Sequence, residues 1–480
     1  MRLSPADMEK FFNPESIALV GVSRSGTRLG GLSFLSKFIE SGYEGRLYPI
    51  NAKAEDILGI KAWPDLASLP EIPDLVIIAV GAPKVPDLIA ECAEKGARHV
   101  HLLTAGFDET GTSEGKDLAD NLVAACEKHG VLVIGPNCMG PYRPAARLTA
   151  WGAIPGLAGP LGIISQSGGM TQRLTEYTAS LGLGVEKAVS VGNGSVTDTL
   201  DFLEAFGKDP AIRVIGIYLE GVSDGGRLLT LARDTGLDKP IVLLKGGETD
   251  AGARTAASHT GAMAGSSAVW EAVFRQANMI SVHTMNEWVD ALMACAFVGA
   301  PSSEGVFVLS GGGGTSVTAG DSFIREGLSV PQLSATAMQR LKELVPAAGS
   351  IAGNPLDLWK VFTDLDCLGS LVDMAEQEQD VGIILTERLI ARNAFHMPET
   401  PDLTRQTIER LKERRGRKPV VFAVDSEGGD PWLASEGAAI RSAFGRAGYA
   451  VFPSISRAAR ALARLCRYYK KRAQMLTPKV

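Results

Sequence analysis

The sequence predicts an α/β protein made of three consecutive domains, each built on a doubly wound sheet of parallel strands. Short apolar runs rich in Val, Ile and Leu alternate with segments whose apolar residues recur at helical spacing. Hydrophobic residues make up 45% of the 480 residues, and the 54 glycines suit many tight strand-to-helix turns. We expect the domains to span 1–145, 146–300 and 301–480, with a helix at the end of the third.

The charge and the cysteines exclude several classes of protein. The formal net charge of −6 leaves no excess of Lys and Arg to neutralise phosphates, which excludes a general nucleic-acid binder. The basic segment 457–479 is interpreted as the solvated face of a helix. The six cysteines form no CxxC pair, so neither a metal site nor a disulfide framework is expected. Without a signal core or a run of about 18 apolar residues, the chain is predicted to be cytoplasmic, with no membrane span.

In the first domain, the apolar runs 16–22, 46–50, 75–80, 100–103 and 131–134 are expected to be strands. Ligands of doubly wound sheets bind beyond the carboxyl ends of the strands. The candidate ligand-binding residues there are Gly21, Ser23, Arg24, Lys53, Val80 and Asn137. Arg24 and Lys53 could pair with phosphates, and Ser23 could donate a hydroxyl hydrogen bond.

The turn after the first strand does not favour NAD. It lacks a complete GxGxxG pattern, and Asn51 and Lys53 stand where an acidic residue would bind a nicotinamide ribose. A ligand with additional phosphates, such as coenzyme A, therefore fits this edge better.

In the second domain, the runs 161–165, 185–191, 214–219 and 240–244 are the expected strands. Polar residues follow them at one edge of the sheet: Ser165, Gln166, Ser167, Asn193, Glu220 and His259. Ser167, Gly168 and Gly169 open a helix whose free N–H groups and dipole would bind an anion, although a structural turn without a ligand explains them as well. A carboxylate such as Glu220 would fix the tautomer of a nearby imidazole; the alternative is a solvated strand end.

The segment 246–266 follows the last of these strands. Sixteen of its twenty-one residues are Gly, Ala, Ser or Thr, and His259 lies among them. Small residues allow close approach to a bulky anion. The segment is either a flexible linker with an incidental histidine or a loop that presents His259 to an anion or acyl group.

The third domain repeats the alternation of strand and helix. The expected strands are 305–310, 327–330, 381–386 and 418–424, and Gly311 to Gly314 place free amides at a helix start. Because this domain has no histidine-bearing loop, catalysis is expected in the second domain.

The order of motifs over about 12–355 resembles the α-subunit portion of the NDP-forming (ADP-forming) acyl-CoA synthetases, relatives of succinyl-CoA synthetase. The motifs that carry the resemblance include FNPESIALVGVS, TAGFDETG, GPNCMGPY, ISQSGG, IYLEGVSDGGR, KPIVLLKGG and AASHTGAMAGS. The resemblance implies a Rossmann-like CoA-binding domain followed by two flavodoxin-like domains.

The resemblance also implies a three-step reaction. Acyl-CoA and phosphate give an acyl phosphate and CoA, the phosphoryl group moves to a histidine, and the phosphohistidine phosphorylates ADP; the reverse uses ATP to activate an acid. By position, His259 would be phosphorylated and Glu220 would orient it. The segment 167–169 and Ser258 would bind the phosphate, and Ser23, Arg24 and Lys53 match the CoA-binding region.

The partner follows from the same resemblance. Because the 480 residues contain no ATP-grasp domain, the nucleotide site is expected on a separate β subunit, with ATP or ADP and Mg²⁺ bound there. An (αβ)₂ assembly is the family expectation. The chain alone should bind CoA and accept phosphate without turning over ATP.

Three departures and three alternatives accompany this interpretation. Gly81 stands where the family has proline, SGGGG replaces a TNAGG-like block, and the segment 194–197, which is expected to face the acyl group, lacks the usual lysine and acids. A non-catalytic CoA-binding regulatory subunit would not need His259. A protein acyltransferase would carry an appended acetyltransferase domain, and an NAD-dependent dehydrogenase is disfavoured by Lys53.

Overall fold

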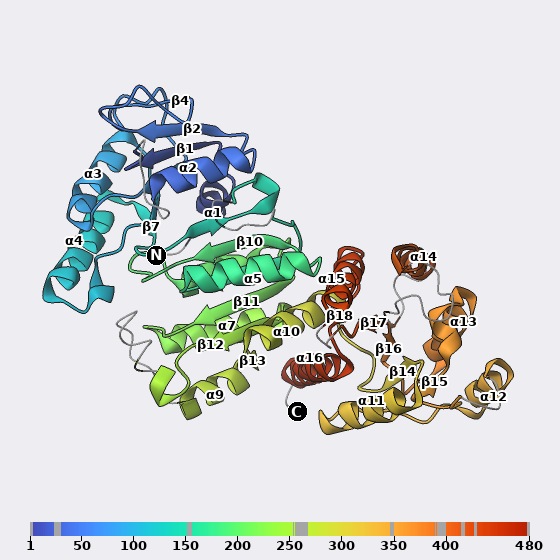
Figure 1. Ribbon diagram of the computed structural model, residues 1–480. Coiled ribbons are helices and arrows are strands. Elements are labelled where there is room, and N and C mark those ends of the chain that lie inside the picture. Colours follow the sequence, from blue (N-terminus) through green and yellow to red (C-terminus); the bar gives the residue numbers. More distant parts are fainter. Residues whose placement is uncertain are drawn as a thin grey trace. The chain divides into compact units, whose positions relative to one another are not determined.

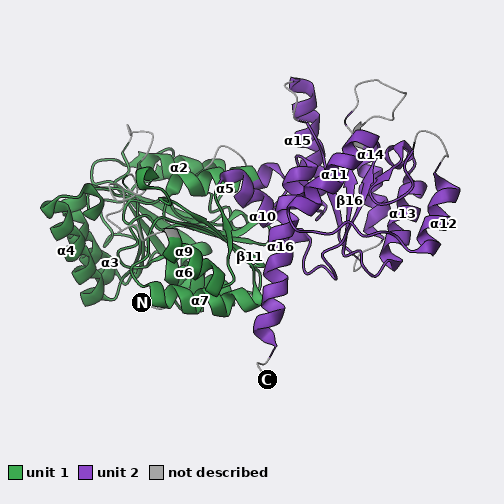
Figure 2. Cartoon of the chain, turned by 90° about the horizontal axis from the view of Figure 1, so that it is seen from below, with its two compact units in different colours: residues 1–177, 184–283 green, residues 178–183, 284–480 purple. Residues whose placement is uncertain are grey.

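The computed structural model describes residues 3–23, 30–149, 151, 156–252, 254, 267–345, 350–388, 390, 400–413, 418–426 and 430–477. The chain divides into two compact units (Figure 2). The first contains residues 1–177 and 184–283, and the second contains residues 178–183 and 284–480.

The first sheet of the first unit has five parallel strands in the order β2-β1-β5-β6-β7 (Figure 1). Its strands are β1 (Ser16–Val20), β2 (Arg46–Ile50), β5 (Leu75–Ile78), β6 (His99–Leu102) and β7 (Leu132–Ile134). Its helices are α1 (Pro5–Phe12), α2 (Gly31–Glu40), α3 (Val85–Lys95) and α4 (Ser113–His129), and a small hairpin is formed by β3 (Asp56–Ile57) and β4 (Ile60–Lys61). The five predicted strands are confirmed to within two residues.

Strand β1 shows why these runs are apolar throughout. Ile17 and Leu19 join a core that contains α2, whereas Ala18 and Val20 face the core of α3 and α4. Successive side chains point to opposite faces, so a strand covered on both faces has no polar position.

The second sheet of the first unit has the order β13-β12-β11-β9-β10-β8. Its strands are β8 (Gly140–Tyr142), β9 (Leu161–Ser165), β10 (Val185–Ser190), β11 (Val214–Leu219), β12 (Ile241–Lys245) and β13 (Ile280–Val282). The helices in this region are α5 (Gly168–Ser180), α6 (Thr199–Lys208), α7 (Gly225–Asp238) and α9 (Ser267–Gln276). The sheet is parallel except for β8, which pairs antiparallel with β10 and was not predicted.

A shared hydrophobic core joins these two sheets. Phe12 of α1 is fully buried, and its ring lies 6.3 Å from that of Phe202 and 5.8 Å from that of Phe206, both on α6. The adjacent Phe11 packs edge-on against His99 of β6, with ring centroids 5.1 Å apart. Helix α1 therefore ties the first sheet to the helical layer of the second.

The second unit contains a parallel sheet in the order β15-β14-β16-β17-β18. Its strands are β14 (Val306–Ser310), β15 (Leu356–Asp357), β16 (Ile383–Glu387), β17 (Val420–Ala423) and β18 (Val451–Phe452). Its helices are α10 (Met285–Phe297), α11 (Gly313–Arg325), α12 (Ala335–Leu344), α13 (Leu365–Gln377), α14 (Thr400–Lys412), α15 (Pro431–Arg446) and α16 (Ile455–Leu476).

One predicted strand of the third domain is wrong. The segment 327–330 makes a single bridge between Ser329 and Gly305, and Pro331 follows immediately without an N–H to extend the pairing. Strands β15 and β18 are only two residues long, too short to produce a periodic pattern.

The predicted fold class, three consecutive doubly wound α/β sheets, is confirmed, apart from the antiparallel edge strand β8. The domain boundaries at about 145 and 300 stay predictions. All six cysteines are buried free thiols. Within the described ranges, no helix is both long and apolar enough to cross a membrane.

The position of Phe12 makes it a test of the shared core. Phe12→Ala should lower the free energy of unfolding by about 3–5 kcal/mol, because the cavity would lie between two layers that cannot both collapse. Urea denaturation followed by circular dichroism measures this. The control Ile72→Ala, at a residue that is 57% exposed, should change stability by less than about 0.5 kcal/mol. Equal effects of the two substitutions would contradict the role of Phe12.

Candidate active site

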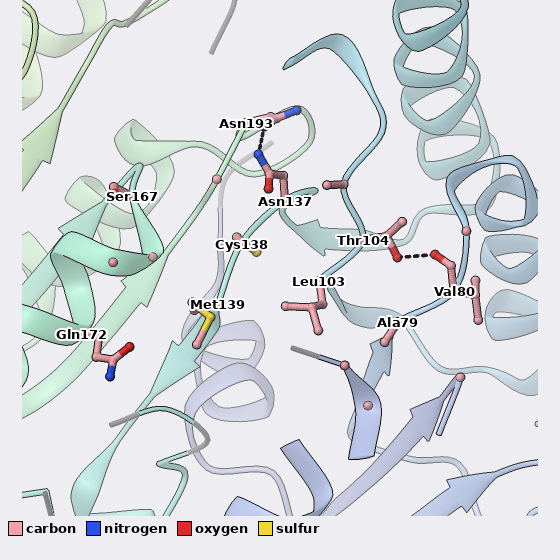
Figure 3. A pocket seen from close by; sticks show the side chains of 18 of the residues that line it. Ala79, Val80, Leu103, Thr104, Asn137, Cys138, Met139, Ser167, Gln172 and Asn193 are labelled. Carbon is pink, nitrogen blue, oxygen red and sulfur yellow. Dashed lines mark hydrogen bonds between the residues drawn. The ribbon is translucent and has the colours of Figure 1, made fainter. Parts of the chain in front are cut away.

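A cavity of about 990 Å³ lies where the strands of both sheets in the first unit end (Figure 3). Turns after β1, β5, β6 and β7 form one part of its wall, and the start of α5 with the turns after β10 and β11 forms the other. Eight predicted site residues line it: Gly21, Ser23, Val80, Asn137, Ser167, Gly168, Gly169 and Glu220.

The other four predicted site residues are not among the described residues that line this cavity. Arg24, Ser258 and His259 lie outside the described residues. Lys53 is exposed and does not belong to the described residues that line the cavity. The side chain of Asn51 explains the course of the chain there, because its Oδ1 accepts the Lys53 N–H at 2.9 Å while its Nδ2 donates to the Val22 carbonyl at 2.7 Å.

Gly21 allows the first turn to pass close to the next strand. Its φ is +90°, and a Cβ at this position would lie 2.4 Å from the carbonyl oxygen of Ala79. Only glycine fits there. Beside this turn, the Thr104 hydroxyl donates to the Val80 carbonyl at 2.7 Å, which fixes the rim between β5 and β6 (Figure 3).

Gly81 does not distort the rim, although the family has proline there. Its φ of −61° and ψ of 140° are values that proline also adopts. A Cβ at Gly81 would meet nothing within 4 Å. The backbone at this position therefore follows a proline-like course.

Hydrogen bonds join the edges of the two sheets at Asn137. Asn137 has a φ of +57°, its N–H donates to the Thr104 carbonyl at 2.8 Å, and its Nδ2 donates to Asn193 Oδ1 at 3.3 Å (Figure 3). The Nδ2 of Asn193 donates in turn to Asp108 Oδ1 at 2.6 Å and to Glu109 Oε2 at 2.5 Å. The turn after β10 is thus held to both turns of the first sheet.

His101 forms a hydrogen bond with the backbone of the segment that follows Asn137. Its Nε2 lies 3.2 Å from the Cys138 carbonyl, which can only accept, so Nε2 carries the proton. Its Nδ1 is buried without a hydrogen-bond partner. Burial lowers the pKa of His101 from its ordinary 6.5 to about 4. His101 is therefore a neutral structural donor at physiological pH.

The start of α5 presents unused donors to the cavity. The Ser165 hydroxyl accepts the Ser167 N–H at 3.1 Å and donates to the Ser167 carbonyl at 2.8 Å. The N–H groups of Gly168 and Gly169 donate to no group among the described residues. Free amides at the positive end of a helix dipole are suited to an anion.

Glu220 is held with one oxygen available. The side chain of Gln166 accepts its N–H at 2.6 Å, and the Tyr218 hydroxyl donates to Glu220 Oε1 at 3.1 Å. Glu220 Oε2 is buried without a partner among the described residues. Burial, followed by the negative charge of Glu220, raises the pKa of Tyr218, so the phenol stays a donor. The carboxylate is thus oriented and can accept one further N–H.

Lys245 and Gly246 bring the next segment past Glu220. The buried Lys245 ammonium donates to the Glu220 carbonyl at 2.8 Å and to the Gly246 carbonyl, and burial lowers its pKa. A Cβ at Gly246 would lie 2.6 Å from the Tyr218 hydroxyl and 3.3 Å from Glu220 Cγ. The chain that continues toward the segment 255–266 therefore leaves β12 in contact with Glu220.

The segment expected to face the acyl group lies elsewhere. Residues 194–197 are not among the described residues that line the cavity. Thr197 is buried, and its hydroxyl donates to the Val133 carbonyl of β7 at 2.6 Å. The segment packs against the first sheet, and only Gly192 and Asn193 of this turn reach the cavity.

Several lining residues were not predicted. Leu103 directly follows β6 and Met139 directly precedes β8, neither carries a charge that marks it, and Gln172 lies within α5. Their one sequence signal was position: Met139 is the fifth residue of the GPNCMG motif, and Gln172 follows Gly168 by one helical turn.

Comparison with known protein families identifies the class of two domains in this chain. Residues 15–144 match the family model of a CoA binding domain, and residues 158–295 match that of a succinyl-CoA ligase like flavodoxin domain. The chain thus carries a CoA-binding domain and a ligase-type flavodoxin domain, and the cavity lies where their strands end.

Individual relatives define the family. The chain is 34% identical to the α subunit of acetate–CoA ligase [ADP-forming] I from Pyrococcus furiosus, over 87% of this chain and 89% of that protein. It is also 34% identical to the α subunit of isoform II from the same organism, over 73% and 76% of the two chains. The solved structure of a dinucleotide-forming acetyl-coenzyme A synthetase 1 from Ca. Korarchaeum cryptofilum, in complex with phosphate and ADP, superimposes with a TM-score of 0.86 at 30% identity and covers 99% of this chain and 100% of that one.

The chain belongs to the ADP-forming acyl-CoA synthetases, a family of acid–thiol ligases, and it corresponds to their α subunits. The match to nearly the whole of an enzyme subunit favours the catalytic interpretation over a non-catalytic CoA-binding subunit.

The buried His101 predicts a pH dependence of stability. The unfolded chain takes up a proton below about pH 6.5, whereas the folded chain does so only near pH 4, so protonation favours unfolding in this window. As the pH is lowered from 6.5 to 4, the contribution of His101 to the free energy of unfolding should fall by up to about 1.4 kcal/mol per pH unit. Above pH 6.5 this contribution should stay constant. The control is His101→Gln, which keeps a donor for the Cys138 carbonyl. The free energies of unfolding of the wild type and of this variant, measured by denaturation at several pH values, should depend differently on pH below 6.5. Parallel pH dependences would contradict this assignment.

Proposed function

We propose that this chain is the α subunit of an enzyme that interconverts a carboxylic acid, CoA and ATP with acyl-CoA, ADP and phosphate, through an acyl phosphate and a phosphohistidine. The observation that carries the proposal is the cavity itself. It joins the turns of a CoA-binding domain to an unused helix start and an oriented carboxylate of a ligase-type domain. Such a cavity can hold a thioester and a phosphate side by side.

The two halves of the cavity suit the two substrates. CoA would lie along the turns that contain Gly21, Ser23 and Val80, with Asn137 at the boundary between the domains. Phosphate would lie at the start of α5, where the free N–H groups of Gly168 and Gly169 and the Ser167 hydroxyl converge. A phosphate oxygen would then attack the thioester carbonyl; the C–O bond forms, the C–S bond breaks, and CoA leaves as the thiolate.

The second step transfers the phosphoryl group to His259. The neutral imidazole would attack phosphorus, an N–P bond would form, and the P–O bond to the acyl group would break, releasing the carboxylate. Glu220 is suited to orient the imidazole because Tyr218 holds one carboxylate oxygen while the other is buried without a partner. Accepting the second imidazole N–H fixes the tautomer and stabilises the positive charge that develops on the ring.

The third step would take place on another chain. We propose an ATP-grasp β subunit that carries the nucleotide site, with Mg²⁺ accompanying ATP or ADP there. Two relatives named as α subunits support such a partner. An (αβ)₂ assembly and a cytoplasmic location complete the proposal, and the six free thiols fit a reducing compartment.

Substitution of the two proposed phosphotransfer residues tests the proposal. With the β subunit and labelled ATP, the wild-type chain should become phosphorylated, whereas His259→Ala should form no acid-labile phosphoprotein. Glu220→Gln should slow phosphorylation by about 10- to 100-fold, since the tautomer is no longer fixed by a charge. Full synthetase activity with acid-labile phosphate in His259→Ala would overturn the assignment, as would ATP-dependent turnover by the chain alone.

The helix start permits a steric test of phosphate binding. Gly169 lines the cavity, and a Cβ there would meet nothing within 4 Å, so Gly169→Ala should leave the fold intact. The methyl group should raise the KM for phosphate by at least about 10-fold, because it occupies space beside the free amides. The matched control is Gly225→Ala at the start of α7, which is equally open and lies away from the cavity. An unchanged KM for phosphate in Gly169→Ala would contradict the assignment.

A further inference from the structure

The acyl group needs a wall, and residues 194–197 do not provide it. The acyl carbon must lie between the sulfur of CoA and the phosphate, which places it at the boundary of the two halves of the cavity. The wall must therefore be built by residues that line the cavity next to the start of α5.

Met139 is one such residue. It is half-buried, it lines the cavity, and its N–H donates to the Ser190 hydroxyl at the end of β10 at 3.3 Å (Figure 3). A Cβ at Gly168 would lie 2.5 Å from Met139 Cγ. The methionine side chain therefore covers the first residue of α5, beside the free amides.

Gln172 is the second. It lies four residues after Gly168 and three after Gly169, so it shares their face of the helix. It is half-buried, lines the cavity, and donates from Nε2 to Glu176 Oε1 at 3.1 Å. Met139, Gly168 and Gln172 thus form one continuous surface next to the proposed phosphate site.

This surface is uncharged. Among the described residues that line the cavity, Glu220 is the one acidic side chain, and there is no Lys, Arg or His. A second carboxylate on the acid would meet no cation among the described lining residues and would be repelled by Glu220. A flexible thioether and a neutral amide instead suit an aliphatic tail or one with a hydroxyl group.

We propose that Met139 and Gln172 form the acyl-group wall and determine which acids the enzyme accepts. Met139 limits the length of an apolar tail, and Gln172 contacts its far end. The substrate class that fits is a monocarboxylic acid with a short, uncharged tail. This inference rests on the proposed function.

Substrate profiles of variants test the wall. The chain, paired with its β subunit, is assayed with CoA, ATP and straight-chain acids of two to six carbons, with succinate as the dicarboxylic acid. Met139→Ala should raise the ratio of kcat/KM for hexanoate to that for acetate by at least about 10-fold, and Met139→Phe should lower it. Gln172→Leu should raise kcat/KM for hexanoate relative to a hydroxylated acid of the same length. Succinate should stay a poor substrate throughout.

Met170→Ala is the matched control, because Met170 lies on α5 with Gln172, is half-buried, and is absent from the described lining of the cavity. It should keep the wild-type ratio. If Met139→Ala is unfolded by circular dichroism, Met139→Val removes less volume and should raise the same ratio by a smaller factor.

Phosphorylation of the chain by ATP separates this inference from the proposed function, since that step needs no acid. Absence of phosphoprotein in the wild type would refute the function itself. Normal phosphorylation in the Met139 variants with unchanged acid ratios, or efficient use of succinate by the wild type, would overturn the acyl-wall assignment alone.

Discussion

The site depends on a hydrophobic contact that lies far from it. Phe12 and the α6 phenylalanines bury their rings against one another, so the first and second sheets share a core. Strands β1, β5, β6 and β7 of the first sheet and β9, β10 and β11 of the second are parallel within their sheets, and the turns after them line the same cavity. The close packing of this core fixes the positions of the two sheets. Short-range hydrogen bonds are then enough to position the polar residues at the strand ends.

Those hydrogen bonds show how one carboxylate is prepared for a partner. Gln166 fixes the backbone of Glu220, Lys245 fixes its carbonyl, and Tyr218 fixes one of its carboxylate oxygens. A buried carboxylate oxygen without a partner costs free energy in the resting protein. The neighbouring residues hold the side chain so that this oxygen stays without a partner. A hydrogen bond from an incoming N–H group would offset the free-energy cost.

Prediction from sequence succeeded where the type of a residue depends on its own burial in the fold. Strands buried on both faces must be apolar throughout, so β1, β9 and β11 were found from composition alone. Glu220 and the start of α5 were found because strand ends in parallel sheets converge. The antiparallel strand β8 and the wall residue Met139 depend instead on which distant segments meet. The hydrogen bond from the Lys53 N–H to Asn51, which shapes this turn, could not be read from the sequence, and the role of Lys53 in CoA binding stays a prediction.

Under the proposed function, the backbone amides at the start of α5 have a consequence for the release of the phosphoryl group. A lysine or arginine at the start of α5 would bind phosphate through full charge, at about twice the strength of a neutral hydrogen bond. Backbone amides bind the anion more weakly, and their positions are fixed by the helix. In the proposed reaction the phosphoryl group passes from this chain to a nucleotide on a second one, and such donors would release it more easily. The start of α5 would then suit a site through which phosphate passes rather than one that retains it.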